Sequence, residues 1–175
     1  AADDITISAR DESSIMSDAR GVSVAAGLGV STSAGVSVAL TLAFNEIDND
    51  IWAYIKNAED LDSTGGDVKV SAQDSATITS KAIAASVAVS GSGSAAFGVS
   101  GGGARADNEI GTSVRAYITG SDVAAAVGDI TVKAKSDSTI KAEILAASGS
   151  VAVGASAAVG ASVGAALAQN LIGTD

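Results

Sequence analysis

The side chains in this chain whose types and spacing could do chemistry are clustered carboxylates. Asp48 and Asp50 stand close together, and Asp62 belongs to a second acidic stretch further on. Calcium takes about six to eight oxygen ligands, which carboxylates and backbone carbonyls can supply, so these three residues are calcium candidates. The second copy of the sequence repeat described below carries Gly111 and Ser113 in place of the first two. Solvated turn residues are therefore the favoured interpretation, and no cofactor is expected.

Composition excludes several other kinds of site. The chain has 0 His and 0 Cys, which removes histidine-assisted nucleophilic catalysis and the usual structural zinc sites. A carboxylate pair could serve a glycosidase, but with aromatic residues at 3% no sugar-binding platform accompanies one. The sequence therefore predicts no enzyme.

Charge and hydropathy restrict the partners. The net charge is -10 at pH 7, and a polyanion is repelled by nucleic acid and by anionic membranes. The uncharged stretch 151–168 alternates apolar residues with Gly, Ser and Ala, unlike the continuous apolar run of a membrane-spanning helix. We expect no nucleic-acid partner and no membrane insertion.

An internal repeat is the strongest signal in the sequence. The segment Asp4-Ile5-Thr6-Ile7-Ser8-Ala9 recurs, with conservative changes, from Asp67 and again from Asp129, which gives a repeat of about 62 residues. Residues 1–175 are therefore interpreted as a single repeat array, with an incomplete third unit, composed of units 4–66, 67–128 and 129–175.

A second set of matching positions keeps the same spacing. Asn45-Glu46-Ile47 recurs as Asn108-Glu109-Ile110 and as Asn170-Leu171-Ile172. The strand Ile51–Ile55 likewise matches Val114–Ile118, and its repeated aromatic residue predicts a stacked ladder. The structural anchors of the repeat are Ile47, Ile110, Ile172, Tyr54 and Tyr117.

Within a unit, apolar and small residues alternate with period 2, which is typical of β-strands. A short strand Ile5–Ala9 is expected to lead into a long one from Ser14 to Ala26. A second long strand is expected from Val30 to Ile47. Asn and Asp residues over Asn45–Asp50 predict a turn, and Ile51–Ile55 is expected to be the last strand.

These patterns predict an all-β repeat architecture. Hydrophobic residues make up 47% of the chain, yet they are mostly Ala and Val, and Gly contributes 20 residues, so sheets can approach closely. A flattened β-solenoid, in which equivalent strands of successive units pair in parallel, is favoured. A stacked β-sandwich array, in which the two long strands of each unit form hairpins, is the alternative.

The second unit resembles repeats of giant bacterial secreted or surface proteins of the filamentous-haemagglutinin-like or adhesin-type β-helix group. The resemblance is carried by Ala82–Val89, Gly98–Ala104, Asn108–Ile110 and Val114–Ile118. It implies an extracellular or cell-surface β-solenoid that serves as a stalk, fibre or adhesive surface. It brings no catalytic residues.

Two functions are therefore expected as alternatives. The first is a structural segment of an extracellular fibre, stalk or surface layer, whose open strand edges pair with other copies or with adjacent repeats of a longer chain. The incomplete third unit favours this interpretation. The second is an adhesin module that binds a surface glycan or a protein through the variable acidic loops Lys56–Gly66 and Gly120–Gly128.

Overall fold

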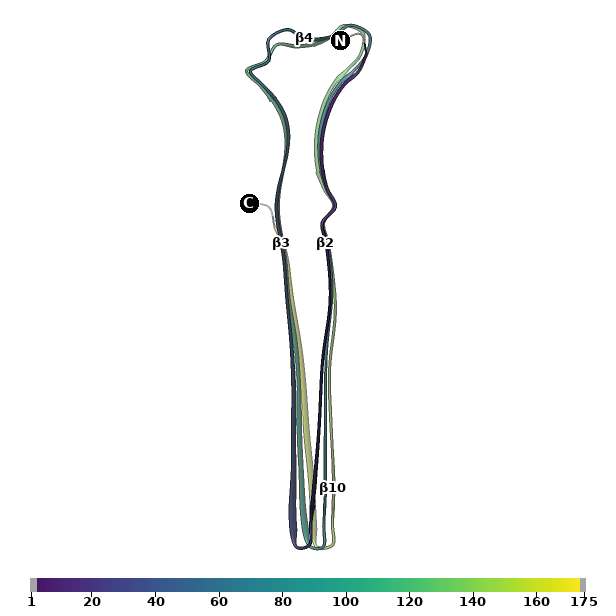
Figure 1. The fold of residues 1–175 in the computed structure, drawn as a ribbon, viewed down its shortest axis with the longest axis vertical. Coiled ribbons are helices and arrows are strands. Elements are labelled where there is room, and N and C mark those ends of the chain that lie inside the picture. The colour runs from purple at the N-terminus through teal and green to yellow at the C-terminus, as the bar shows by residue number, and fades with distance from the viewer. Residues whose placement is uncertain (1–2, 174–175) are drawn as a thin grey trace.

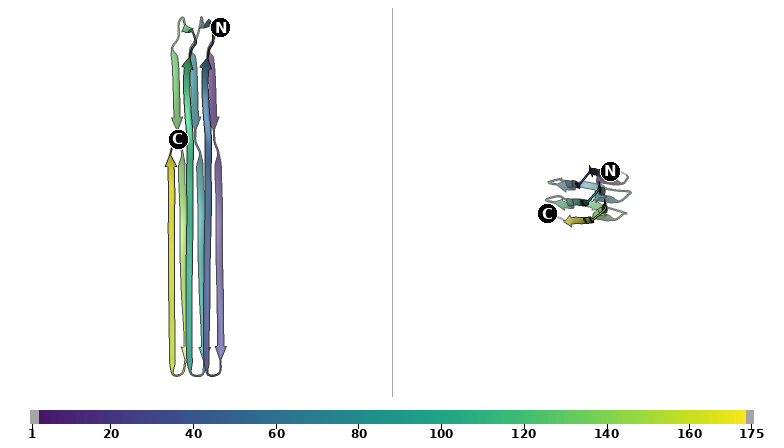
Figure 2. Two further views of the ribbon diagram at one scale, coloured as in Figure 1. Left: turned by 90° about the vertical axis from the view of Figure 1, so that its left-hand side faces the viewer. Right: turned by 90° about the horizontal axis from the view of Figure 1, so that it is seen from below.

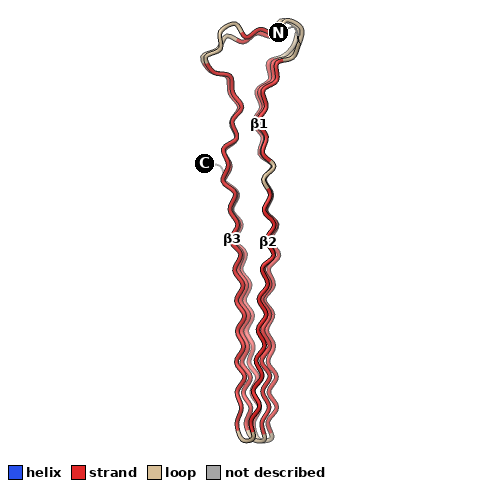
Figure 3. Tube along the Cα trace, in the orientation of Figure 1, coloured by secondary structure: helices blue, strands red, loops and turns tan. Residues whose placement is uncertain are grey.

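A computed structural model describes residues 3–173 as an all-β structure, without helices in that range (Figure 3). The first unit contains β1 (Ile5–Asp11), β2 (Ser14–Gly29), β3 (Thr32–Lys56) and β4 (Leu61–Ser63). The second contains β5 (Val68–Asp74), β6 (Thr77–Ser92), β7 (Ala95–Thr119) and β8 (Val123–Ala125). The third contains β9 (Ile130–Ser136), β10 (Thr139–Gly154) and β11 (Ala157–Gly173). Residues 3–173 accordingly include no helical membrane span.

The chain traces a long, narrow loop and then repeats it beside the first. It runs along β1 and β2, reverses in a tight turn, returns along β3 and crosses over through β4 to begin β5 (Figure 1). The successive loops lie side by side as layers (Figure 2). The arrangement is solenoid-like.

All strand pairing described in the structure is parallel and in register. The sheets have the orders β1-β5-β9, β10-β6-β2, β11-β7-β3 and β4-β8. Thus Ile5 pairs with Val68, which pairs in turn with Ile130. The two long strands β2 and β3 pair with β6 and β7 respectively, and not with each other as hairpins.

The prediction of a turn over Asn45–Asp50 is wrong, because β3 continues unbroken to Lys56. The strand expected separately at Ile51–Ile55 is part of β3. Burial keeps alternating through the segment: Asn45 and Ile47 are buried, whereas Asp48 is exposed. Asp and Asn favour turns only where their side chains compete for backbone hydrogen bonds. Here the acidic side chains face solvent, and the Asn45 amide bonds to another unit.

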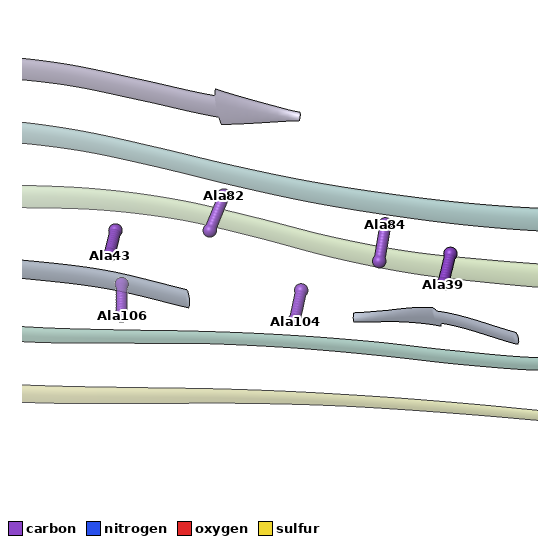
Figure 4. Packing of buried hydrophobic residues seen from close by; sticks show 6 residues of the cluster. All are labelled: Ala39, Ala43, Ala82, Ala84, Ala104 and Ala106. Carbon is purple, nitrogen blue, oxygen red and sulfur yellow. The ribbon is translucent and has the colours of Figure 1, made fainter. Parts of the chain in front are cut away.

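The core is thin and consists mostly of small side chains. One cluster contains only alanines among its buried members, which lie between the facing long strands (Figure 4): Ala39, Ala43, Ala82, Ala84, Ala104 and Ala106. The facing sheets approach so closely that a Cβ added to Gly102 would lie 2.8 Å from the carbonyl oxygen of Ala147. Small residues therefore fill the interior because the backbones themselves are nearly in contact.

Candidate assembly interface

The strands at the two ends of the stack have open edges. At one end β1, β2 and β3 pair on one side only, and at the other end β9, β10 and β11 do. In the middle layer Val68 and Val70 are 0% exposed, whereas Ile130 and Val132 at the same repeat positions of β9 are 47% and 45% exposed. Two features leave the β9 side chains open: no further layer covers them, and β11 ends at Gly173, before the stretch that corresponds to Ile51–Ile55. In the first unit Ile51 and Ile55 are buried with a neighbouring layer on one side only.

Asparagine side chains form a hydrogen-bonded ladder along the stack. Nδ2 of Asn45 donates to Oδ1 of Asn108 at 2.7 Å, and Nδ2 of Asn108 donates to Oδ1 of Asn170 at 2.8 Å. Because each amide has a donor and an acceptor end, the ladder has a direction. It presents an acceptor, Oδ1 of Asn45, toward one end of the stack and a donor, Nδ2 of Asn170, toward the other.

The two ends of the stack are therefore complementary to each other and not to themselves. In a parallel stack all strands run in the same direction, and each strand hydrogen-bonds to one neighbour through each of its two edges. The free edge at one end of the stack therefore matches the free edge at the other end. A head-to-tail contact of this kind extends without limit when successive units are related mainly by translation, as the stacked layers of Figure 2 are. This geometry permits further units to be added head to tail.

Aspartates at the start of each unit link the layers through the backbone. Oδ1 of Asp4 accepts the N–H of Asp67 at 2.8 Å, and Oδ1 of Asp67 accepts the N–H of Asp129 at 3.0 Å. The hydrogen bond from Lys69, and then that from the Asp129 backbone, lower the pKa of the Asp67 carboxyl below its usual value. The same ion pair raises the pKa of Lys69.

A carboxylate is buried at the corner between β5 and β6. Asp74 is 0% exposed, and its Oδ2 accepts hydrogen bonds from the hydroxyls of Ser138 at 2.6 Å and Ser136 at 2.9 Å. Both serines belong to the next unit. Since a buried charge is costly unless it is hydrogen-bonded, the third unit supplies polar partners that Asp74 needs.

At the same corner of the first unit, the carboxylate has hydrogen-bond partners within its own unit. Asp11 pairs with Asp74 in register and accepts hydrogen bonds from the Ser13 hydroxyl at 2.8 Å and from Nδ2 of Asn49 at 3.0 Å. Burial raises the pKa of the Asp11 carboxyl, but the hydrogen bonds from Ser13 and Asn49 outweigh it and lower the pKa overall. Sequence reasoning missed this corner. Its signal is the recurrence of Asp11, Asp74 and Ser136 at one repeat position.

Repeat-equivalent aromatic residues stack on the outer face of β3 and β7. The rings of Tyr54 and Tyr117 lie 5.2 Å apart between centroids, with 7° between their planes. Beside them the guanidinium of Arg115 lies 5.2 Å from the Trp52 ring centre, a cation–π distance.

The isoleucine anchors of the repeat also lie at equivalent positions of neighbouring strands. Ile47 pairs in register with Ile110, and Ile110 with Ile172.

The structure separates the calcium candidates. Asp48 and Asp50 lie on the same exposed face of β3, where they line a shallow pocket with Arg115. Asp62 lies on β4, in a different sheet. Across residues 3–173 no group of three or more acidic residues is placed to hold a metal ion. Two neighbouring carboxylates supply too few of the oxygens that calcium takes.

Comparisons with known proteins do not indicate a function, so the functional argument rests on the fold and on its hydrogen-bonded ladders. No protein-family model, no curated protein and no solved structure matches the chain. The likeness to haemagglutinin-type and adhesin-type repeats consequently stays a prediction from the residues that carry it.

Proposed function

We propose that the chain is a structural segment of an extracellular bacterial fibre, stalk or surface layer. In this proposal it is a flattened β-solenoid of about 62 residues per unit, and it assembles by end-to-end stacking of strands. The neighbours are other copies of the chain or adjacent repeats of a longer one. The extracellular and bacterial assignments come from the sequence resemblance.

The observation that carries the proposal is the apolar surface left open on β9 at the end of the stack. Ile130 and Val132 are half-exposed, while their counterparts between two layers are fully buried. Completing the burial of each such side chain contributes roughly 1 kcal/mol, about half of the value for a whole aliphatic side chain. The open edges of β9, β10 and β11 would gain backbone hydrogen bonds in the same step.

Electron microscopy of the purified chain at micromolar concentration tests this function. We expect long filaments whose fibre diffraction shows an axial spacing of about 4.8 Å, the distance between paired strands. Monodisperse short rods would contradict the proposal.

A matched pair of variants on β9 identifies the interface. Val132→Lys places a charge on the inward face that the next layer would cover, and it should abolish filaments while the chain stays folded, because the site lies at an open edge. The neighbouring Thr131→Lys adds the same charge on the outward face and should leave filaments intact. Equal filament formation by both variants would exclude β9 as a contact.

A second candidate function is that of an adhesin module. The crossovers that contain β4 and β8 share a backbone path, in which the Asp122 N–H donates to the Ala58 carbonyl at 3.1 Å, while their side chains differ. A regular scaffold that presents variable loops is suited to recognition, and glycans or proteins are the proposed ligands. Glycan-array binding that is lost in the double variant Glu59→Gln, Asp60→Asn would favour this function, and an inert array would count against it.

A further inference from the structure

Each unit has a segment without any charged residue, and the three segments lie together. These segments, 21–45, 82–104 and 144–173, contain no Asp, Glu, Lys or Arg; we call them the charge-free half. They include the tight turns that follow β2, β6 and β10, which lie at the end of the molecule opposite β4 (Figure 1). The charges of the described residues are therefore confined to the rest of the molecule.

The outer surface of the charge-free half is apolar. On β3 the inward positions carry Ser37, Thr41 and Asn45, which are buried. The alternate positions point outward and are 49% to 68% exposed: Val36, Val38, Leu40, Leu42 and Phe44.

Adding further units to the stack does not cover this surface. In the middle layer, which has neighbours on both sides, Val87 and Val89 of β6 are still 42% and 39% exposed, and Phe97 and Val99 of β7 are 45% and 47% exposed. Apolar patches that extend over several hundred Å² usually mark a contact with another molecule. Something other than axial stacking is needed to bury them.

A lipid bilayer fits this surface less well than another protein sheet does. Any stack of finite length leaves open strand edges, and unpaired backbone groups are not tolerated in hydrocarbon. Interfacial aromatic residues normally mark the boundary of a membrane-embedded zone. Here Trp52 and Tyr54 lie on β3 well beyond that boundary, past the acidic stretch from Glu46 to Asp50.

We propose that the charge-free half is a lateral interface with a second copy of this chain, in which the outer faces of the β3-β7-β11 sheets pack together with opposite orientations. The outward side chains of β3 next to the charge-free half are Glu46, Asp48 and Asp50, and the net charge is -10. Copies packed with the same orientation would bring these carboxylates together. Opposite orientations overlap only the neutral halves and direct the charged halves apart.

The apolar face of one chain is too small for a stable lateral contact, so the contact requires axial stacking first. The inference therefore rests on the proposed fibre. Residues 32–41 of β3 pair with the uncharged stretch of β7 that ends at Ala104. These ten residues span about 33 Å, and three paired strands span about 14 Å, which gives one chain a face of roughly 470 Å². A stable interface needs about 800 Å² per partner. A single chain therefore falls short, whereas two stacked chains exceed this area, and filaments should pair where isolated chains do not.

Electron microscopy of filaments from two variants of β7 tests the lateral contact. Wild-type filaments should be paired or bundled. Val99→Glu places a charge within the apolar face and should give single filaments with an unchanged axial spacing, which also shows that the variant is folded. Thr119→Glu adds the same charge to the exposed end of the same strand and should leave the pairing unchanged.

Cross-linking tests the orientation, because the chain contains no native cysteine. Val38→Cys lies near the middle of the proposed overlap, and a short bis-maleimide should link it between two copies. Lys56→Cys lies outside the overlap and should link only if copies pack with the same orientation. Axially stacked copies are three units apart, about 14 Å, so a linker shorter than that reports lateral contacts alone.

Several outcomes would overturn the lateral interface. Wild-type filaments that stay single, or Val99→Glu filaments that still pair, would refute it and leave the fibre proposal standing. Linkage of Lys56→Cys without linkage of Val38→Cys would refute the opposite orientation. Flotation of wild-type protein, but not of Val99→Glu, with phosphatidylcholine vesicles would assign the face to lipid. Failure of the wild-type chain to form any filament would overturn both proposals.

Discussion

The isoleucine that is buried in the centre of the stack gives the sharpest test of how neighbouring units contribute to stability. Ile110 is 0% exposed and belongs to a buried cluster with Ile47 and Ile78. Its equivalent in the last layer, Ile172, is 52% exposed. Ile110→Ala should lower the free energy of unfolding by about 3 to 4 kcal/mol, since it removes a buried side chain and leaves a cavity. Ile172→Ala should cost about 1 kcal/mol, because half of its surface is already in water.

Urea unfolding below the concentration at which filaments form measures both variants. The two midpoints should differ while the slope with denaturant stays the same, since the surface exposed on unfolding hardly changes. In the proposed filaments the next copy would cover Ile172, so its substitution should become nearly as destabilising there as that of Ile110. Equal losses in the unassembled chain would refute the idea that the open end of the stack leaves Ile172 contributing less to stability than Ile110.

Three further outcomes are expected. Gly102→Ala should destabilise the chain by about 1 to 3 kcal/mol, because its Cβ would meet the Ala147 carbonyl oxygen. Gly149→Ala, with nothing within 4 Å of its Cβ, should be neutral or raise the unfolding temperature. Folding lowers the pKa of Asp67 below its ordinary value of 3.8. The ionised carboxylate therefore stabilises the folded chain fully above pH 3.8, and this stabilisation is lost as the pH falls from 3.8 toward the lower pKa of the folded state. Asp67→Asn should therefore make urea midpoints fall less steeply on acidification over that range, and an unchanged slope would contradict this assignment. Calcium and a chelator should give the same melting temperature, and a rise with calcium would show that carboxylates on β3 bind it.

The repeat pattern led directly to the pairing partners. The recurrence of Asp4, Asp67 and Asp129 in the sequence matches aspartates that accept backbone hydrogen bonds from one layer to the next. The recurrence of Asn45 and Asn108 likewise corresponds to a ladder of amides. In-register stacking brings identical repeat positions together, so self-similarity in a sequence becomes proximity in space.

The local turn preference of Asn and Asp was misleading in β3. Asp48 and Asp50 suggested a loop, but a strand with one face in water accepts acidic residues at every second position. The buried partners of that stretch, such as Ile51, align with Val114 in the next unit, and this pairing overrides the preference. The carboxylate corner at Asp74 was also missed, because its partners Ser136 and Ser138 are far away in sequence.

The sequence alone determined that the chain is a β repeat, which positions are equivalent, and that the two sides of each long strand differ. Only the tertiary structure decided which side is inside. An alternation such as Leu40 and Thr41 has the same period whichever residue faces inward. The two sheets approach until glycine and alanine backbones nearly touch, so no space remains between them for leucine or phenylalanine. In the charge-free half the bulky apolar side chains therefore point outward, and the small and polar ones form the interior.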